Sequence, residues 1–166
     1  SYTAPFTWTA KNAVVAAEDR RFYQHSGFDV KGFSRAMWNN LTTGSSQGGS
    51  TITQQYVKNV YLTSERSIGR KLKEAVLAVK LERELEKDEI LERYLNTIYF
   101  GRGAYGVGAA TRAYFDKDVR DIGLQEASYL AGLIRSPGGA DALENPAEAA
   151  RRRSTVLAAM AEEGYI

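Results

Sequence analysis

The spacing of apolar residues is the feature that most constrains the fold of this chain. They recur at the helical period of 3.6 residues, and no hairpin signal or run of alternating strands appears. The clearest segment is Ser67–Glu86, whose apolar stripe is Ile68, Leu72, Ala75, Val76 and Val79. A second segment, Asp88–Phe100, uses Ile90, Leu91, Tyr94, Leu95 and Ile98. The sequence therefore predicts a mainly α-helical domain.

Weaker patterns predict shorter helices between and beyond these two. They cover Ala10–His25 with Thr9 as N-cap, Phe28–Leu41, Thr51–Val60 and Gln125–Arg135. The last helix begins with Asn145 as N-cap, Pro146 in the first turn and Glu148 closing a capping box, and Gly164 ends it. Loops are predicted at Thr42–Ser50 and around Gly101, Gly103, Gly106 and Gly108.

Length and composition exclude several classes of protein. The 166 residues suit one domain spanning 1–166, and 43% hydrophobic with 25% charged residues is typical of a globular chain. The net charge of 22 − 20 = +2 does not indicate a nucleic-acid partner. The longest uncharged stretch, Ala36–Val57, is too polar to span a membrane. The chain starts at Ser1 without Met, so we expect it to be part of a longer protein.

The chemistry open to the chain is also limited. Cysteine is absent, and the single His25 excludes a multi-histidine metal site. The sequence holds no Ser-x-x-Lys motif, no Gly-x-Ser-x-Gly elbow and no phosphate-binding P-loop. Any catalysis must therefore depend on carboxylates, hydroxyls and cations.

Three charged or polar segments are candidates for that chemistry. In EDRRFYQHSGFD, Glu18, Phe22 and His25 share a face of the predicted helix, which suits a general base beside an aromatic ring; the alternative is a solvated helix end. GGSTITQQYVKN and its Lys58 suit an anion site at a helix start; the alternative is an ordinary capped helix. RKLKE pairs Arg70 with Glu74, either to hold a pyrophosphate or as a solvent-facing ion pair.

Taken in order, five segments resemble the family 51 glycosyltransferase domain, the peptidoglycan polymerase of class A penicillin-binding proteins and of monofunctional transglycosylases. They are EDRRFYQHSGFD (18–29), GGSTITQQYVKN (48–59), RKLKE (70–74), KDEILERYLNTIYFGRGAYGVGAA (87–110) and ASYLAGLIRSP (127–137). The resemblance implies a lysozyme-like helical fold with a head lobe and a smaller, membrane-proximal jaw. Its jaw would include Phe28, Phe33, Met37, Trp38 and Leu41, which either enter lipid or pack internally.

The resemblance also implies the reaction. A growing glycan chain on undecaprenyl pyrophosphate would be joined to lipid II by a β-1,4 bond, with inversion. Glu18 matches the general base, and Glu74 matches a second, supporting glutamate. Either Glu74 or Asp19 could bind a divalent cation, Mg²⁺ or Mn²⁺; no organic cofactor is implied. The implied substrate-binding residues are Asp19, Ser50, Thr51, Gln54, Gln55, Lys58, Arg70, Lys71 and Asn96.

Such domains act at the outer face of the bacterial plasma membrane. A longer parent chain anchors them and often carries a transpeptidase domain, and phosphoglycolipids of the moenomycin type target the cleft. Two rival functions stay open. A lysozyme-like enzyme that cleaves peptidoglycan would need no cation cluster, and a non-catalytic module could bind anionic lipid through Arg20, Arg21 and Arg151–Arg153.

Overall fold

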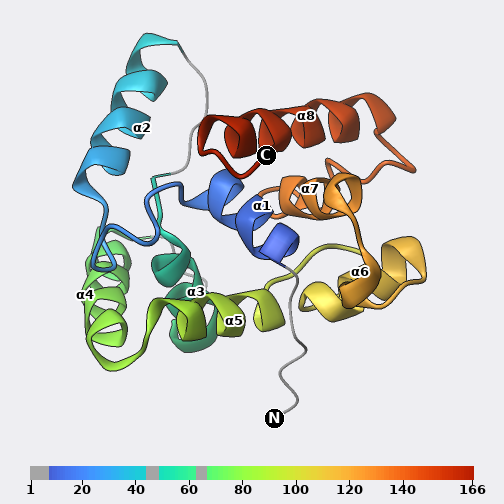
Figure 1. Cartoon of the computed structure of the whole chain (residues 1–166). Helices are drawn as coiled ribbons and strands as arrows, with labels where there is room; N and C mark the ends of the chain where they lie inside the picture. The colour runs from blue at the N-terminus through green and yellow to red at the C-terminus, as the bar shows by residue number, and fades with distance from the viewer. Residues whose placement is uncertain (1–7, 44–48, 63–66) are drawn as a thin grey trace. The chain divides into compact units, whose positions relative to one another are not determined.

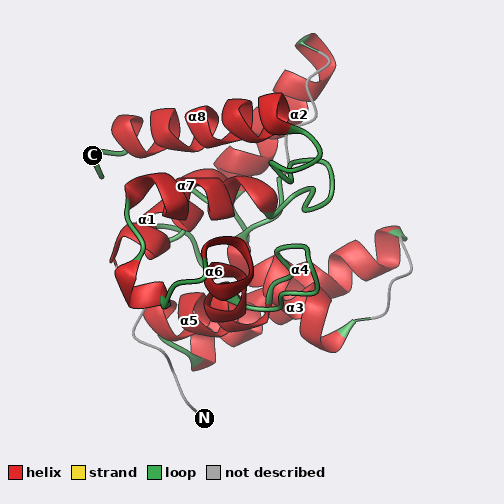
Figure 2. Ribbon diagram, turned by 90° about the vertical axis from the view of Figure 1, so that its right-hand side faces the viewer, coloured by secondary structure: helices red, strands yellow, loops and turns green. Residues whose placement is uncertain are grey.

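Helices account for the regular structure of this protein (Figures 1 and 2). The computed structural model describes residues 8–43, 49–62 and 67–166, and within these ranges the only β-structure is an isolated bridge between Tyr99 and Tyr105. The helices are α1 (Trp8–Glu18), α2 (Val30–Thr42), α3 (Ile52–Tyr61), α4 (Ile68–Glu84), α5 (Lys87–Thr97), α6 (Val107–Phe115), α7 (Leu124–Leu133) and α8 (Pro146–Glu162), with a 3₁₀ turn η1 at Val119–Asp121. The predicted mainly α-helical class is confirmed.

The chain divides into two compact units, in line with the two predicted lobes. The first unit comprises Ser1–Arg20 and Glu92–Ile166, and in it α1, α7 and α8 pack against one another (Figure 1). Alanines and larger aliphatic residues alternate along these helices, so their axes can approach closely. Its buried residues include Ala13, Val14, Leu130, Leu133, Val156 and Met160.

The second unit comprises Arg21–Leu91, and its centre is the packing of α3 against α4. A capping box begins α3: Thr51 accepts a hydrogen bond from the backbone of Gln54, whose side chain accepts one from the backbone of Thr51. The buried apolar residues of this unit include Phe22, Ile52, Tyr56, Val57, Ala78 and Ile90. Helix α5 begins in this unit and ends in the first.

The first predicted helix was too long. Helix α1 starts at Trp8, one residue before the predicted N-cap, and ends at Glu18, while residues 20–27 form turns and bends. Phe22 is fully buried in the second unit, which requires the chain to leave the helical path after Glu18. The expectation that Glu18, Phe22 and His25 lie on one helical face was therefore wrong.

Helix α4 buries the opposite face from the one predicted. Ile68, Leu72 and Val76 are exposed, whereas Glu74 and Ala78 are buried. The backbone of Ala78 faces the turn at Gly27, so the small side chain of this face permits close packing. Ile68, Leu72 and Val76 point to solvent, whereas Ala75 and Val79 of the predicted stripe are half-buried. The inner face is occupied by the contact with Gly27 and by the ion pairs of Glu74.

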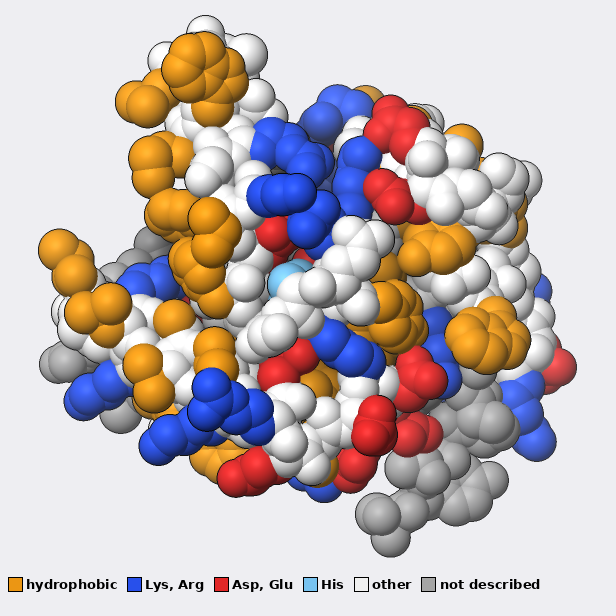
Figure 3. Space-filling view, turned by 60° about the vertical axis from the view of Figure 1, so that its left-hand side comes forward, with side chains coloured by type: hydrophobic (Ala, Val, Ile, Leu, Met, Phe, Trp, Pro, Cys, Tyr) orange, Lys and Arg blue, Asp and Glu red, His pale blue; other side chains and the backbone are white. Residues whose placement is uncertain are grey.

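The apolar side chains of the predicted jaw are exposed as well. Trp38 and Leu41 have relative exposures of 68% and 78%. We define the apolar surface of the second unit as these exposed side chains together with those of α4 (Figure 3); its members are Phe28, Val30, Phe33, Met37, Trp38, Leu41, Ile68, Leu72 and Val76. Trp38 and Leu41 are therefore not packed internally, whereas Phe28 and Phe33 are partly buried and contact each other, with ring centroids 5.8 Å apart. No helix in the described ranges has the length and hydropathy of a membrane span.

Several predicted boundaries need correction. Residues 44–48 of the predicted loop, including Gly48, lie outside the described residues, and Thr42 ends α2. Helix α5 stops at Thr97, because the next residues hydrogen-bond to a turn instead. The carbonyl of Ile98 accepts a hydrogen bond from the backbone N–H of Gly106, and the N–H of Phe100 donates one to the carbonyl of Ala104. Gly108, expected to break regularity, lies within α6.

The start of α8 was placed correctly, but not its capping box. Asn145 is the N-cap residue and Pro146 the first helical residue, yet Asn145 makes no side-chain cap bond. Glu148 instead accepts hydrogen bonds from Arg151 and Arg152, which lower the pKa of Glu148 to about 2. These two arginines therefore form ordinary ion pairs along an exposed helix.

Replacing Gly27 by alanine should destabilise the second unit. Gly27 has φ +102°, and a Cβ there would lie 2.8 Å from the backbone of Ala78. Strain of this kind costs about 1–3 kcal/mol, to be measured as a lower free energy of unfolding in urea. Gly69→Ala is the matched control, because its Cβ would meet nothing closer than 3.9 Å in the first turn of α4. The control should be neutral or stabilising by about 0.5–1 kcal/mol; equal effects would contradict the argument.

Candidate active site

Glu18 is the buried carboxylate of the first unit. It ends α1, its side chain is 4% exposed, and its Oε1 atom lies 3.6 Å from Nε of Arg135, in the segment after α7. A carboxylate removed from water needs such a partner, since an unpaired buried charge is costly. Arg135 belongs to the fifth motif, and its contact with Glu18 was not predicted from the sequence. A buried, oriented carboxylate is suited to accept a proton.

Tyr94 is a second polar group near Glu18, although its place in the apolar stripe of 88–100 predicted only a core residue. It is fully buried on α5, and burial, followed by the charge of Glu18, raises the pKa of Tyr94 well above its usual value. The charge of Arg135 lowers the pKa of Tyr94, and the charge of Asp19 raises it. The phenol therefore stays protonated beside the carboxylate. Its only sequence signal was a hydroxyl on an otherwise apolar helical face.

Glu74 is the centre of a charged cluster in the second unit. Its side chain is 1% exposed; Lys71 Nζ lies 3.0 Å from Oε1 and Arg70 Nε lies 4.0 Å from Oε2. Lys71 Nζ also donates to the Ser50 hydroxyl at 2.9 Å, so the second and third motifs meet here. We call Ser50, Arg70, Lys71 and Glu74 the cation cluster. The alternative of a solvent-facing ion pair is excluded by the burial of Glu74.

The Glu74 carboxylate is buried beside two cations of its own helix. Among the described residues, Oε2 of Glu74 receives no hydrogen bond, although it is buried. The carboxylate is therefore held by charge from two cations on its own helix, at i−4 and i−3. The ammonium of Lys71 is half exposed and has three protons, of which Ser50 and Glu74 take two. This leaves a donor that an anionic ligand could use.

The remaining predicted site residues are distributed over both units. Thr51 and Gln54 are buried, and their side chains make the capping box of α3; Thr51 also donates to the carbonyl of Gly27 at 2.9 Å. Gln55 and Lys58 lie half-buried on α3, which packs against the helix of the cation cluster. Asp19 is buried and Asn96 exposed in the first unit. Substrate contacts by these residues stay predictions.

His25 and Gly106 make contacts within the chain itself. His25 Nδ1 accepts a hydrogen bond from the backbone of Gly27 at 3.0 Å, which gives this histidine a structural role in the turn. Gly106 has φ +86°, and a Cβ there would lie 2.6 Å from the carbonyl oxygen of Asn96. The close approach that Gly106 permits is therefore to the chain's own backbone.

Comparison with known proteins identifies the family. The model of the family described as Transglycosylase matches residues 4–161. The chain belongs to the transglycosylase family. Its relatives include penicillin-binding protein 1A of Neisseria lactamica, 51% identical over 162 residues, which are 97% of this chain and 20% of the relative. Penicillin-binding protein 1F of Bacillus subtilis is 43% identical over 157 residues, 94% of this chain and 22% of the relative.

This match confirms both the family and the enzyme class that the five motifs predicted. The transglycosylase chain is a glycosyltransferase, and it is similar to a region of penicillin-binding proteins. It spans about a fifth of the length of the curated relatives it matches.

The described part of the transglycosylase holds no group of three or more His, Cys, Asp or Glu side chains placed to bind a metal ion. Glu74 is already paired with two cations, and Asp19 directly follows the buried Glu18 in the other unit. Mg²⁺ usually keeps several waters and binds through one or two carboxylates plus substrate phosphates. A carboxylate from Glu74 or Asp19 to such an ion stays a prediction.

Proposed function

We propose that this transglycosylase polymerises lipid II into peptidoglycan strands. The growing chain on undecaprenyl pyrophosphate is the donor, lipid II is the acceptor, and the product is a β-1,4-linked glycan formed with inversion. The cation cluster carries the proposal, because fixed cations are needed for a phosphate leaving group and not for a sugar hydroxyl. The family match supports transfer of a glycosyl group.

Glu18 has the role of general base in this proposal. The acceptor's 4-hydroxyl oxygen forms a bond to C1 of the donor sugar while its proton passes to the Glu18 carboxylate. The carboxylate must lie within about 2.6–3.2 Å of that hydroxyl. Arg135 supports this role by holding Oε1 from one side at 3.6 Å. A substrate hydroxyl can approach the carboxylate when Arg135, which is partly exposed, moves toward solvent.

Lys71, Arg70 and Lys58 have the role of stabilising the leaving group. As the C1–oxygen bond breaks, its electron pair passes to the pyrophosphate, whose added charge needs fixed donors in a poorly hydrated site. Lys71 is held in place by Ser50 and Glu74 before substrate binds, so little reorganisation is required. Glu74 supports the reaction by orienting these cations. That Glu18 and these cations face one substrate stays a prediction.

A divalent cation enters the proposal only with the substrate. The substrate's phosphates would supply most of the ligands to this ion, and Glu74 or Asp19 would supply at most one carboxylate. When bound, such an ion adds positive charge next to the departing pyrophosphate. The residues of the chain bind and orient the same group without it.

The test is incubation of the purified chain with lipid II in vesicles. We expect glycan polymers of increasing length on a gel, undecaprenyl pyrophosphate by mass spectrometry, and cleavage of the polymer by an enzyme specific for β-1,4 bonds. Clipping of purified sacculi without polymer formation would instead support the peptidoglycan-cleaving rival. Vesicle binding without turnover of either substrate would support the non-catalytic rival.

We also propose that the apolar surface of the second unit contacts the membrane that holds the lipid-linked substrates. Trp38 and Leu72 are more than 60% exposed. Burying such a side chain in lipid yields about 1.5–3 kcal/mol. A large exposed apolar surface of this kind is unusual on a folded domain and indicates an interface. Lys31 and Arg35 are basic residues of α2, which suits anionic lipid.

The double change Trp38→Ser and Leu72→Ser should weaken membrane binding. We expect affinity for vesicles of phosphatidylethanolamine and phosphatidylglycerol to fall at least about tenfold, because two apolar side chains no longer enter lipid. Sedimentation with the vesicles measures it. Leu143→Ser, at an exposed leucine of the first unit, is the control and should bind as the unchanged chain does. Equal losses in both variants would refute the assignment.

The relatives suggest the setting of this reaction. They are named penicillin-binding proteins, and the chain matches about a fifth of each. We propose that the parent chain carries a transpeptidase domain and a membrane anchor, which would place the reaction at the outer face of the plasma membrane. We further propose that phosphoglycolipids of the moenomycin type compete for the pyrophosphate site.

A further inference from the structure

Glu82 is a buried carboxylate that the proposed reaction does not use. It lies in the last turn of α4, and its side chain is 5% exposed. Its Oε1 atom accepts a hydrogen bond from the Thr53 hydroxyl at 2.7 Å and one from Lys87 Nζ at 2.8 Å. Lys87 Nζ lies 2.6 Å from Oε2. One carboxylate therefore joins the first turn of α3, the end of α4 and the first residue of α5.

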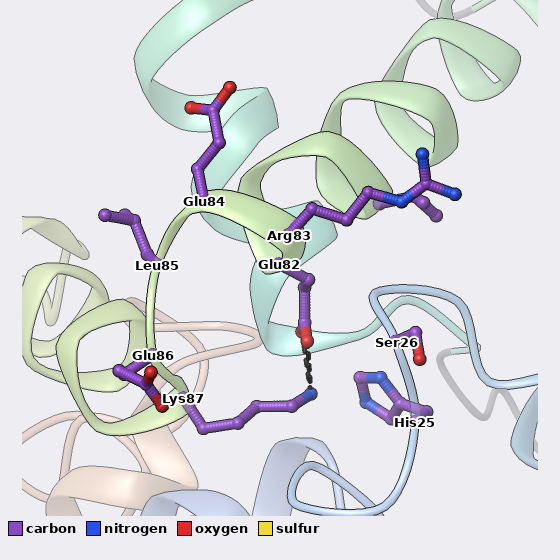
Figure 4. A pocket seen from close by; sticks show the side chains of 9 residues that line it. His25, Ser26, Glu82, Arg83, Glu84, Leu85, Glu86 and Lys87 are labelled. Atoms are coloured by element: carbon purple, nitrogen blue, oxygen red, sulfur yellow. Dashed lines mark hydrogen bonds and ion pairs between the residues drawn. The ribbon is translucent and has the colours of Figure 1, made fainter.

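Lys87 extends this network to the first motif. Its side chain reaches Glu82 along a pocket of about 450 Å³, lined by His25, Ser26 and residues 79 and 82–87, and the pair faces the imidazole of His25 (Figure 4). The ammonium also lies 4.6 Å from the centroid of the buried Phe22 ring, close enough for a cation–π contact. The network thus fixes α3 relative to the turn that contains His25.

Stability alone is a weak reason for such an arrangement. A buried ion pair seldom stabilises a fold more than apolar residues of similar size, because both charges lose their hydration. What the pair does supply is a defined geometry, since each oxygen of Glu82 has a specific donor. The pair fixes the position of the start of α3 through Thr53. Thr51 fixes the same turn through the hydrogen bond of its hydroxyl to the Gly27 carbonyl.

We propose that Glu82 is a positioning residue for α3: through Thr53 and Lys87 it fixes the helix that presents Lys58 to the pyrophosphate. The inference rests on the proposed function, because it concerns the same leaving-group site. Lys58 lies in the last turn of α3, so a shift at the first turn changes its place beside the helix of the cation cluster. Glu82 itself does not contact substrate.

The test deletes the Thr53 donor without changing the volume of its buried side chain. Thr53→Val should raise KM for lipid II about tenfold, the factor for losing one hydrogen bond to a charged group, with a smaller change in kcat. Thr53→Ser keeps the hydroxyl and should restore KM. Thr111→Val is the matched control: Thr111 is also fully buried, and among the described residues its hydroxyl donates to the carbonyl of Val107 within its own helix, α6.

The measurements are made well below the unfolding midpoint of every variant, which is recorded separately. A purely structural role predicts lower midpoints for Thr53→Val and Thr111→Val alike with unchanged KM, and this result would overturn the inference. Glu82→Gln provides a second test, since it leaves Lys87 without its charge partner and should raise KM further than Thr53→Val. If the unchanged chain does not polymerise lipid II, the proposed function fails. If it polymerises lipid II but KM is insensitive to both substitutions, only the positioning role of Glu82 fails.

Discussion

Glu18→Gln should reduce the rate of lipid II polymerisation by about 10²–10⁴-fold, the range for a general base. Glutamine has the size and hydrogen-bonding oxygen of glutamate but cannot take the proton of the acceptor hydroxyl. Glu18 is almost wholly buried at the end of α1, so water cannot easily substitute as the base. The rate of lipid II consumption measures the loss, and circular dichroism shows whether the helical fold is kept.

A matched carboxylate separates this effect from a general change in charge. Glu163 is exposed after the end of α8, in the same unit as Glu18. Glu163→Gln removes the same charge and should leave the rate unchanged. Arg135 is partly exposed, so solvent can hydrate it when the charge of Glu18 is removed. Full activity of Glu18→Gln would remove Glu18 from the role of base.

The helical class and most helices could be predicted because their signals are local. The period of the apolar residues placed α4 and α5 to within a few residues, and Pro146 marked the start of α8. The end of α1 had no such local signal. It is set by the burial of Phe22 in the second unit, a contact that depends on distant parts of the chain.

The buried face of α4 shows a different limit. Its sequence contains two helical stripes, one with Ile68, Leu72 and Val76 and one with Arg70, Glu74 and Ala78. Hydrophobicity favours burial of the first stripe, yet the second is the inner one. The close approach of Gly27 to Ala78 and the charge partners of Glu74 decide the outcome, and neither can be inferred from period alone.

The candidate site was predicted in part for the same reason. The pairing of Arg70 with Glu74 follows from their i, i+4 spacing and is present. The contacts of Lys71 with Ser50 and of Arg135 with Glu18 join residues far apart in sequence. Thr51 and Gln54 were assigned to substrate from their motif, whereas much of their hydrogen-bonding capacity serves the capping box of α3.

Lys71→Met should reduce kcat/KM for lipid II by about 10²–10³-fold, the range for removing one donor that stabilises charge in a transition state. Methionine keeps much of the side-chain length but removes the ammonium that binds Ser50 and Glu74. Steady-state rates on lipid II measure the effect. Lys58→Ala should act in the same direction, and Lys71→Arg, which keeps a charge with different geometry, should retain more activity than Lys71→Met.

Lys73→Met is the matched control for Lys71→Met. Lys73 is exposed on the same helix two residues further on, where its side chain points in a different direction. Loss of Lys71 also leaves buried Glu74 with Arg70 as its cation, so the thermal midpoint of Lys71→Met should fall while that of Lys73→Met should not. A variant that is less stable yet polymerises at the original rate would show that Lys71 serves only the fold. Loss of rate at an assay temperature well below its midpoint would assign Lys71 to the departing pyrophosphate.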